Sequence, residues 1–406
     1  MSERGEDESQ ARRRNLLFYS AFSFFTYPFA AVPLLFFFFR ERGLSLQEYA
    51  SLISIYYLAM VIFELPTGWL ADRIGRRPAM IGGPLLLSAA FFTLWTGHEF
   101  STFAIGEVLF GLGHALLSGP PSALLYETLA AGNRADSYLR IESRMTAIRG
   151  GGTSLSFLAG GVIAHFHGSA SALLLTSCLC LGAVLAAFGL EEPPIRKPTT
   201  PVVNKRLHHR LGLVYRNPAV LWLLFYYSLL FFLLRFAFHT QQPILKEWGR
   251  SDYLFLGFLY FLLSLSALPP TWFTAQLRKK IGERTLLLLL PTLISFSLIG
   301  LSFGTHWSFA LLFFVQQAPF GMHWPLVHAF ANHRIPSQDR ALVLSTLSFT
   351  GRIVFSISFA LLLTDKTELS NLFLEVGLVT FVLALLIQFF LPRDDPAHDA
   401  RGTHPQ

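Results

Sequence analysis

The sequence is poor in charged residues and in cysteine. Only 14% of its 406 residues are Asp, Glu, Lys or Arg, whereas soluble globular domains carry about 25%, so the composition excludes an ordinary soluble protein. Its two cysteines, Cys178 and Cys180, lie in one apolar segment and complete no metal-ligand spacing, and we assign them a structural role. The chain also lacks a GxxxxGK[ST] phosphate loop, which argues against direct use of ATP, and the hydrolase signatures HExxH and GxSxG.

What the chain has instead is long apolar runs. Hydrophobic residues make up 52% of it, and its mean hydropathy is positive. A helix needs roughly 20 apolar residues to cross a bilayer core, whereas barrel strands would be shorter and alternating. We therefore predict an all-α membrane protein with twelve transmembrane helices. These spans are expected at residues 15–39, 45–70, 78–97, 101–127, 139–164, 169–190, 219–245, 252–276, 284–304, 307–331, 340–363 and 369–391.

Basic residues are concentrated in alternate connections between the predicted spans. The connections on the side of the N-terminus carry clusters such as Arg12–Arg14, Arg76–Arg77 and Arg278–Lys280, and the opposite set carries few. Because Lys and Arg are retained in cytoplasmic loops, both termini are expected in the cytoplasm. This topology explains the formal net charge of +7, so we infer no nucleic-acid partner. The first apolar run is too long for a signal-peptide core and is expected to be a retained helix.

A basic connection rich in proline divides the spans into two sets of six. Its part from Lys205 to Tyr215 is expected either to lie on the anionic inner leaflet as a short helix or to be a solvated linker. The predicted organisation is a disordered N-terminus at 1–14, an N-terminal six-helix bundle at 15–190, a cytoplasmic linker at 191–218, a C-terminal six-helix bundle at 219–391 and a disordered tail at 392–406.

The two halves repeat a charged turn, which we call the elbow, between their second and third spans. The first copy reads ADRIGRR at 71–77 and the second reads RKKIGER at 278–284. Gly75 corresponds to Gly282, and the acid at Asp72 is replaced in the second copy. Internal repeats of this kind are how many transporters build two bundles around a central site. We therefore predict two pseudo-symmetric halves.

The pattern GxxxDRxGRR from Gly68 to Arg77, with the twelve spans, resembles the major facilitator superfamily. The phrases FELPTGWLADRIGRR, SGPPSALLYETL and RIPSQDRALVLS are most similar to bacterial permeases grouped with drug and metabolite exporters. The resemblance implies a proton- or ion-driven transporter of the bacterial inner membrane, working as a monomer among membrane lipids, without a cofactor or metal. It also implies that spans one, four, seven and ten line the cavity. Two departures weaken the analogy with drug:proton antiporters, because Glu107 replaces an arginine and the segment GGGTSLSFLAGG lacks a proline.

By the same resemblance, the first elbow acts as a gate. Charged hydrogen bonds across a closed cytoplasmic interface would hold one conformation and break in the other. Arg76 would pair with Glu127, and Asp72 would face the start of span eleven. The alternative is that these charges only stop and orient the span. The gating residues are Gly68, Asp72, Arg73, Gly75, Arg76, Arg77 and Glu127.

Polar residues recur at helical spacing inside several spans, where they are expected to face a wet cavity. Three arginines at middle depth would favour an amphipathic organic anion, and Tyr227 and Tyr260 could contact its apolar part. The alternative is that the arginines form structural pairs with Glu107, Glu142 or Glu375. The cavity candidates are Tyr27, Arg149, Arg235, His239, Gln316, Gln317, His323, Trp324 and Arg352.

Three titratable residues are candidates for proton coupling. Glu107 is the first, because low-dielectric surroundings favour the neutral form of an acid. His114 follows on the same helix face, and Glu64 is a second acid to test. The sequence thus predicts a proton-coupled exporter of a small amphipathic solute. The alternatives are an importer on the same scaffold and, less favoured because no catalytic cluster is evident, a polytopic membrane enzyme.

Overall fold

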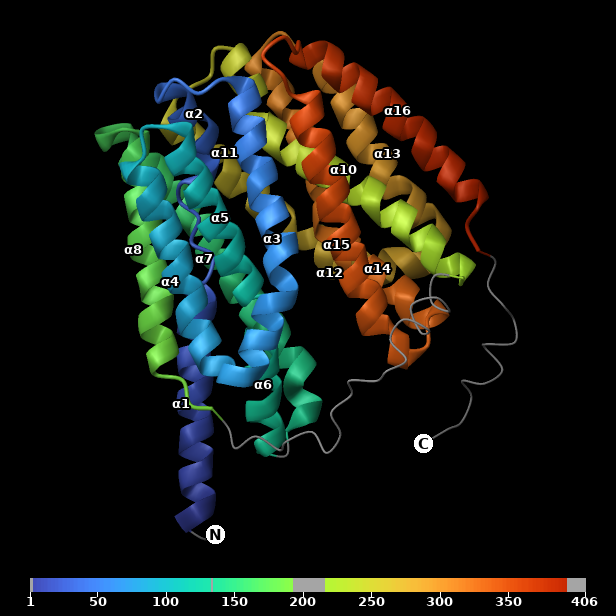
Figure 1. The fold of residues 1–406 in the computed structure, drawn as a ribbon. Coiled ribbons are helices and arrows are strands. Elements are labelled where there is room, and N and C mark those ends of the chain that lie inside the picture. Colours follow the sequence, from blue (N-terminus) through green and yellow to red (C-terminus); the bar gives the residue numbers. More distant parts are fainter. Residues whose placement is uncertain (1–2, 133, 193–215, 393–406) are drawn as a thin grey trace.

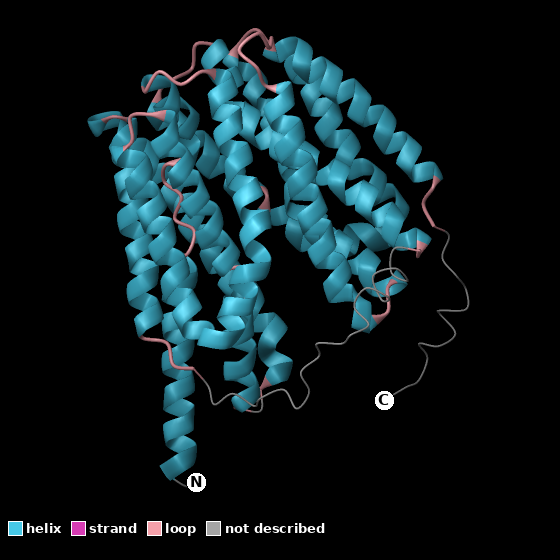
Figure 2. Cartoon of the chain, viewed as in Figure 1, coloured by secondary structure: helices cyan, strands magenta, loops and turns pink. Residues whose placement is uncertain are grey.

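The chain folds into two bundles of long helices (Figures 1 and 2). The structure is a computed structural model, and it describes residues 3–132, 134–192 and 216–392. All regular elements in these ranges are helical. The first half contains α1 (Glu3–Phe25), η1 (Val32–Leu34), α2 (Leu35–Glu41), α3 (Leu46–Ile74), α4 (Arg76–Thr96), α5 (Phe100–Leu116), α6 (Pro120–Ala131), η2 (Ala135–Ser137), α7 (Tyr138–His167) and α8 (Ser169–Phe188).

The second half repeats this order of long and interrupted helices. Its elements are α10 (Pro218–Glu247), α11 (Tyr253–Ser266), α12 (Leu268–Ile281), α13 (Glu283–Ser302), η3 (Trp307–Leu311), α14 (Leu312–Arg334), α15 (Ser337–Leu362) and α16 (Leu369–Phe389). Within the described ranges, nine helical segments are long and apolar enough to cross a bilayer. Twelve crossings fit the element order when α1 with α2, α5 with α6 and α11 with α12 each count as one crossing.

Local sequence explains where several helices begin and end. Ser45 caps α3 in a reciprocal capping box with Glu48, at 3.1 and 2.7 Å. Asn217 caps α10, whose first residue is the proline that this position favours. Both elbows turn at a glycine with positive φ, 104° at Gly75 and 86° at Gly282, a conformation that side chains rarely adopt. The elbow repeat is therefore structural as well as sequential.

The first predicted span is not one continuous helix. Helix α1 ends at Phe25, residues 26–31 are non-helical, and the crossing resumes in η1 and α2. Prolines cannot donate to a helical ladder, and the freed backbone groups need other partners inside a membrane. Thr153 donates to the carbonyl of Tyr27 at 2.9 Å, and the N–H of Ala31 donates to Thr176 at 3.0 Å. We call residues 26–31 the span-one break.

Three further predictions about the chain needed adjustment. Span four is interrupted between α5 and α6, and span eight is interrupted at Ala267, just before two consecutive prolines. Helix α1 begins at Glu3, inside the segment 1–14 for which the sequence predicts disorder. This stretch is rich in Glu, Gln, Ala and Arg, which favour a helix. Residues 193–215 of the predicted linker and 393–406 of the predicted tail lie outside the described ranges.

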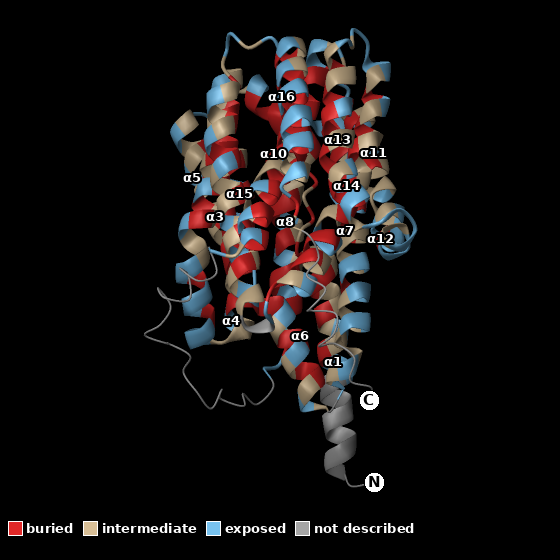
Figure 3. Ribbon diagram, turned by 90° about the vertical axis from the view of Figure 1, so that its right-hand side faces the viewer, coloured by how far each residue is buried: buried red, intermediate tan, exposed pale blue. Residues whose placement is uncertain are grey.

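The apolar residues are divided between the interior and the outer faces of the bundles. Buried residues gather between the helices, while exposed ones lie on their outer sides (Figure 3). The outer faces carry large apolar side chains, such as Leu65, Phe166 and Phe389, which is 84% exposed. An exposed apolar surface of this kind is what lipid covers in a membrane protein. The two halves approach each other closely where Gly161 of α7 meets Gly257 of α11.

Candidate functional site

A cavity of about 290 Å³ lies between the two halves. It brings together four of the predicted cavity residues: Arg235, His323, Trp324 and Arg352. We call it the central cavity. Its remaining lining residues are Tyr56, Tyr57, Met60, Tyr227, Phe231 and Ser348. It is therefore an aromatic cavity with two cationic side chains.

Arg235 of α10 is the cavity cation that has no acidic partner among the described residues. Its guanidinium carbon lies 5.2 Å from the ring centre of Phe231 and 5.8 Å from that of Phe320. Its Nε atom is buried and makes no hydrogen bond. Aromatic faces attract a cation but leave its hydrogen-bond donors unsatisfied. The guanidinium of Arg235 can therefore donate hydrogen bonds to an acceptor group of a ligand.

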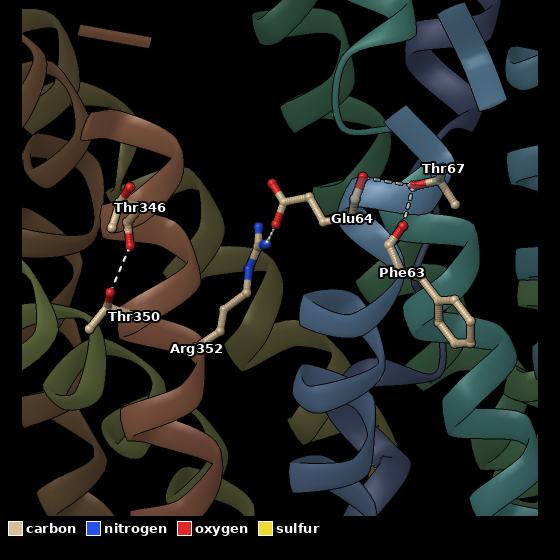
Figure 4. Close-up of polar contacts among 6 residues, drawn as sticks. All are labelled: Phe63, Glu64, Thr67, Thr346, Thr350 and Arg352. Carbon is tan, nitrogen blue, oxygen red and sulfur yellow. Dashed lines mark hydrogen bonds and ion pairs between the residues drawn. The ribbon is translucent and has the colours of Figure 1, made fainter. Parts of the chain in front are cut away.

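Arg352 of α15 forms an ion pair with Glu64 of α3, across the boundary between the halves (Figure 4). The side chains of Arg352 and Glu64 are only 16% and 22% exposed. Glu64 lies close to Pro66, the proline inside α3. The hydroxyl of Thr67, the residue after this proline, donates to the carbonyl of Phe63 at 2.7 Å. The alternative pairing of this arginine with Glu107, Glu142 or Glu375 does not hold, because its partner is Glu64.

Arg149 of α7 lies outside the central cavity. Its Nη2 atom is 4.0 Å from Oε1 of Glu142, two turns earlier on the same helix. Glu142 is one of the structural partners that the sequence suggested. The three intramembrane arginines thus have three different environments: one pairs within its own helix, one pairs across the halves, and Arg235 is held between aromatic rings.

A second pocket, of about 180 Å³, lies behind Arg235. We call it the rear pocket. It contains the predicted residues Gln316 and Gln317 of α14 and Tyr260 of α11, together with Gln241 of α10. Most of the other side chains around it are apolar, and they come from α7, α10, α11, α13 and α14. Arg235 lines both cavities, so the two spaces share one cationic wall.

The predicted titratable residues Glu107 and His114 lie in α5, away from the lining of both cavities. Glu107 is 1% exposed, and neither of its carboxyl oxygens has a hydrogen-bond partner among the residues that the structure describes. His114 forms a 2.6 Å hydrogen bond through Nδ1 with the Tyr56 hydroxyl, and Tyr56 does line the central cavity. Among the described residues, no hydrogen bond joins Glu107 to His114.

Two other predicted cavity residues belong to the packing between helices. His239 of α10 lies 3.2 Å through Nε2 from the Tyr57 hydroxyl, and its ring stacks on Phe355. Tyr27 lies in the span-one break, where its ring contacts Phe29 and His114. Neither residue lines the central cavity or the rear pocket.

The first elbow is held by residues of its own half. Arg76 lies 2.5 Å from Asp72 and 3.7 Å from Glu127 at the end of α6. The N–H of Arg77 donates to Glu192 at 3.0 Å. Asp72 is 69% exposed, and among the described residues its ion-pair partner is Arg76. Arg73 lies over the ring of Trp69, and Gly68 has open space around it.

The second elbow carries the same kind of contact with the charges exchanged. Glu283 stands in the position of Arg76, directly after the turn glycine. It pairs with Arg278 and, at 2.5 Å, with Arg334 at the end of α14. Arg334 is the last residue of α14, in the tenth span, and Glu127 lies near the end of α6, in the fourth span. The two residues therefore have equivalent places in the two halves. We call the Arg76–Glu127 and Glu283–Arg334 contacts the charge-inverted elbow pairs.

The two halves are joined at the end opposite the elbows. The Gln242 amide donates to the carbonyl of Val32 at 2.8 Å and accepts from the N–H of Phe36 at 2.9 Å. The N–H of Gln47 donates to Asp365 at 3.1 Å. Toward the elbows the helices of the two halves diverge (Figure 1). We call the joined end the closed end and the other the elbow end.

Sequence reasoning missed several residues that build the site. Tyr56, Tyr57 and Met60 bring α3 into the central cavity, although the prediction assigned the lining to other spans. Gln241 was overlooked beside Gln242. A detectable signal existed, because two adjacent amides in an otherwise apolar span must both find polar partners.

Sequence comparison finds relatives among resistance proteins. The chain is 24% identical over 325 residues to the tetracycline resistance protein, class G, of Vibrio anguillarum, covering 74% of this chain and 76% of that protein. It is 22% identical over 318 residues to the quinolone resistance protein NorA of Staphylococcus aureus, covering 77% and 79%. Both alignments span most of each protein.

Comparison with solved structures shows the fold. A mutant of the nucleoside transporter NupG matches with a TM-score of 0.79 at 12% identity, covering 93% of this chain and 100% of that chain. The peptide transporter POT in complex with sulfate matches with a TM-score of 0.72 at 17% identity, covering 95% and 94%. The sequence profile described as Major Facilitator Superfamily matches residues 16–357 and 279–406. The chain is therefore a multi-pass membrane transporter that belongs to the Major Facilitator Superfamily.

Proposed function

We propose that this transporter moves a small amphipathic organic anion across the bacterial inner membrane by alternating access, in a proton-coupled cycle that exports the solute. Both termini would be cytoplasmic, so that the elbow end faces the cytoplasm, and the protein would act as a monomer. The observation that carries the substrate class is Arg235. A guanidinium without a counter-ion in an aromatic cavity favours a ligand with a negative charge and an apolar body.

The contacts between the halves support alternating access. A rocking carrier must break its contacts at one end of the cavity while forming contacts at the other. Gln242 and Asp365 supply breakable hydrogen bonds at the closed end. When the elbow end closes, Asp72 would move toward the start of α15 and act as the latch. An Asp72→Asn variant should then transport more slowly than the parent while binding the solute equally well.

Three groups remain proposals for proton coupling: Glu107, His114 and Glu64. Glu107 is supported by its burial without a hydrogen bond, because a charged carboxylate is costly in such a place. His114 is linked through Tyr56 to the cavity. A Glu107→Gln variant should lose flux driven by a pH gradient and retain substrate exchange. Parental pH-driven flux in that variant would remove Glu107 from the mechanism.

Export is supported by the relatives whose names describe resistance to tetracycline and quinolones. Import by anion–proton symport is the second candidate, and the Glu64–Arg352 pair favours it. An anion that takes Arg352 would leave Glu64 without its cation, and an acid in that condition favours its neutral form. The anion and a proton would then bind together. Uptake and efflux in membrane vesicles of opposite orientation distinguish the two directions.

The substrate class is tested by binding to the purified full-length protein. Thermal shifts are measured with small organic anions, cations and neutral lipophiles of similar size. Anions should stabilise the parent, and Arg235→Gln should abolish that shift. Arg144→Gln serves as the control, because this exposed arginine of α7 lies outside both cavities. A preference of the parent for cations would contradict the proposal.

A further inference from the structure

Gln241 lines the rear pocket, and the orientation of its side-chain amide is fixed by a chain of polar groups. The Ser297 hydroxyl donates to the carbonyl of Leu312 at 3.0 Å. It therefore accepts from Gln316 Nε2, also at 3.0 Å, and Gln316 Oε1 accepts from Gln241 Nε2 at 2.9 Å. Because a backbone carbonyl can only accept, the direction of each bond in this chain is determined.

The chain ends at the carbonyl oxygen of the Gln241 side chain. Gln241 is only 2% exposed, and its Oε1 atom has no hydrogen-bond partner within the described part of the chain. Leaving a buried acceptor unsatisfied costs about 1–3 kcal/mol, so such an atom requires an explanation.

The size and walls of the rear pocket suit one aromatic ring. Its volume is about 180 Å³, and an engineered apolar protein cavity of about 150 Å³ binds benzene. Phe157 of α7 and Phe238 of α10 pack edge-on against Tyr260, with ring centres 6.1 and 5.9 Å apart. Edge-to-face arrangements are also favourable for a bound ring.

Arg235 connects this pocket with the central cavity. Its guanidinium lies near Phe231, which lines the central cavity, and near Phe320, which lines the rear pocket. A ligand whose anionic group meets Arg235 can therefore extend a ring into the rear pocket. At the far side of that ring, a group that donates a hydrogen bond would satisfy Gln241.

We propose that the rear pocket is a specificity subsite for an aromatic anion that carries a hydroxyl or amino group at the end of its ring opposite the anionic group. The inference rests on the proposed function, because it takes Arg235 as the anion site. It adds a substrate class: the ring fills the space between Phe157 and Phe320, and its O–H or N–H group donates to Gln241 Oε1.

The test compares four probes on the full-length protein in nanodiscs: acetate, benzoate, 4-methoxybenzoate and 4-hydroxybenzoate. Burial of a ring should make benzoate bind at least about tenfold more tightly than acetate. The hydroxyl should make 4-hydroxybenzoate bind about fivefold to tenfold more tightly than the methoxy compound, which has no donor. Isothermal titration measures both ratios.

Three variants separate the subsite from the anion site. Gln241→Leu should remove the advantage of the hydroxyl and keep that of the ring. Ala267→Phe, which fills the pocket without altering the amide chain, should remove the advantage of the ring and keep acetate binding. Arg235→Gln should weaken all four probes.

The outcomes distinguish the two proposals. Equal affinity of the parent for acetate and benzoate, or hydroxyl selectivity that persists in Gln241→Leu, would overturn the subsite while the anion site stands. Undiminished binding of all four probes to Arg235→Gln would show that the anion site itself is wrong. Loss of the ring advantage in Ala267→Phe supports the subsite even if Gln241→Leu does not fold.

Discussion

Removing the acid of the Glu64–Arg352 pair should strengthen the binding of an anion. Arg352 and Arg235 both line the central cavity, but Arg352 is already paired with Glu64. An anion that uses both arginines must first displace Glu64. In a Glu64→Gln variant, Arg352 is free at the outset, so that cost disappears. The opposite substitution, Arg352→Gln, should weaken binding because it removes one of the two cations.

The magnitude follows from the burial of the pair. With exposed fractions of 16% and 22%, it lies between surface pairs, worth about 0–1 kcal/mol, and fully buried pairs, whose disruption costs about 3–5 kcal/mol. We take an intermediate value of about 1–2.3 kcal/mol. At 1.4 kcal/mol for each factor of ten, Glu64→Gln should tighten anion binding about fivefold to fiftyfold.

The assay is titration of the parent and of Glu64→Gln with benzoate between pH 5.5 and 8. If an anion and a proton bind together, the parent should bind more tightly as the pH falls, and the variant should lose this dependence. Other charged or titratable groups face the same cavity, namely Arg235, Tyr56, Tyr57, Tyr227 and His323, and His114 contacts it through Tyr56. These groups are unchanged in the variant, so any pH dependence of affinity that remains in Glu64→Gln would be assigned to them.

Glu99→Gln is the matched control, because this exposed acid precedes α5 and lies outside both cavities. It should leave affinity and pH dependence unchanged. The reasoning is refuted if Glu64→Gln binds benzoate no more tightly than the parent at pH 8. In that case Glu64 and the anion do not compete for Arg352.

Two further predictions concern packing and the closed end. Gly160→Ala would place a methyl group 1.9 Å from the carbonyl oxygen of Ala30 in the span-one break. Gly160→Ala should therefore destabilise the protein by about 1–3 kcal/mol, measured by thermal unfolding. Gly150→Ala on the same helix is the control, because Gly150 has open space around it and its substitution should not lower the melting temperature. Equal melting temperatures of the two variants would contradict this prediction. The N–H of Gln47 lowers the pKa of Asp365 below its ordinary value of 3.8, so their contact is kept at neutral pH and lost only as the pH falls through that lowered pKa. Asp365→Ala should therefore widen the distance between spin labels on the two halves at the closed end at neutral pH, and an unchanged distance distribution would exclude a role in closure.

The positions of the helices could be read from the sequence because hydrophobicity and length decide them. The third predicted span at 78–97 is α4, which runs from Arg76 to Thr96, and the ninth at 284–304 is α13. The span-one break could not be predicted in the same way. Prolines are tolerated in many membrane helices, and the break is stabilised by Thr153 and Thr176, more than a hundred residues away.

The candidate site could be predicted only as a set of residue types. Helical spacing placed Arg149, Arg235 and Arg352 at middle depth, but the function of each depends on which acid can reach it. Glu64 had been considered as a proton-coupling acid, and its partner lies 288 residues away on a helix of the other half. Contacts across a duplicated fold leave no local periodicity in the sequence. Only the structure therefore separates Arg235, which has no acidic partner in the described ranges, from the two paired arginines.

The charge-inverted elbow pairs bear on how the protein is made. Synthesis delivers the N-terminal half first, and domains generally fold as units in that order. Arg76 finds Glu127 within that half, and Glu283 finds Arg334 within the later one. Each half can thus neutralise its elbow during translation, without waiting for the other. The halves can be assembled one after the other, and the boundary between them remains free of the charges that each needs for its own folding.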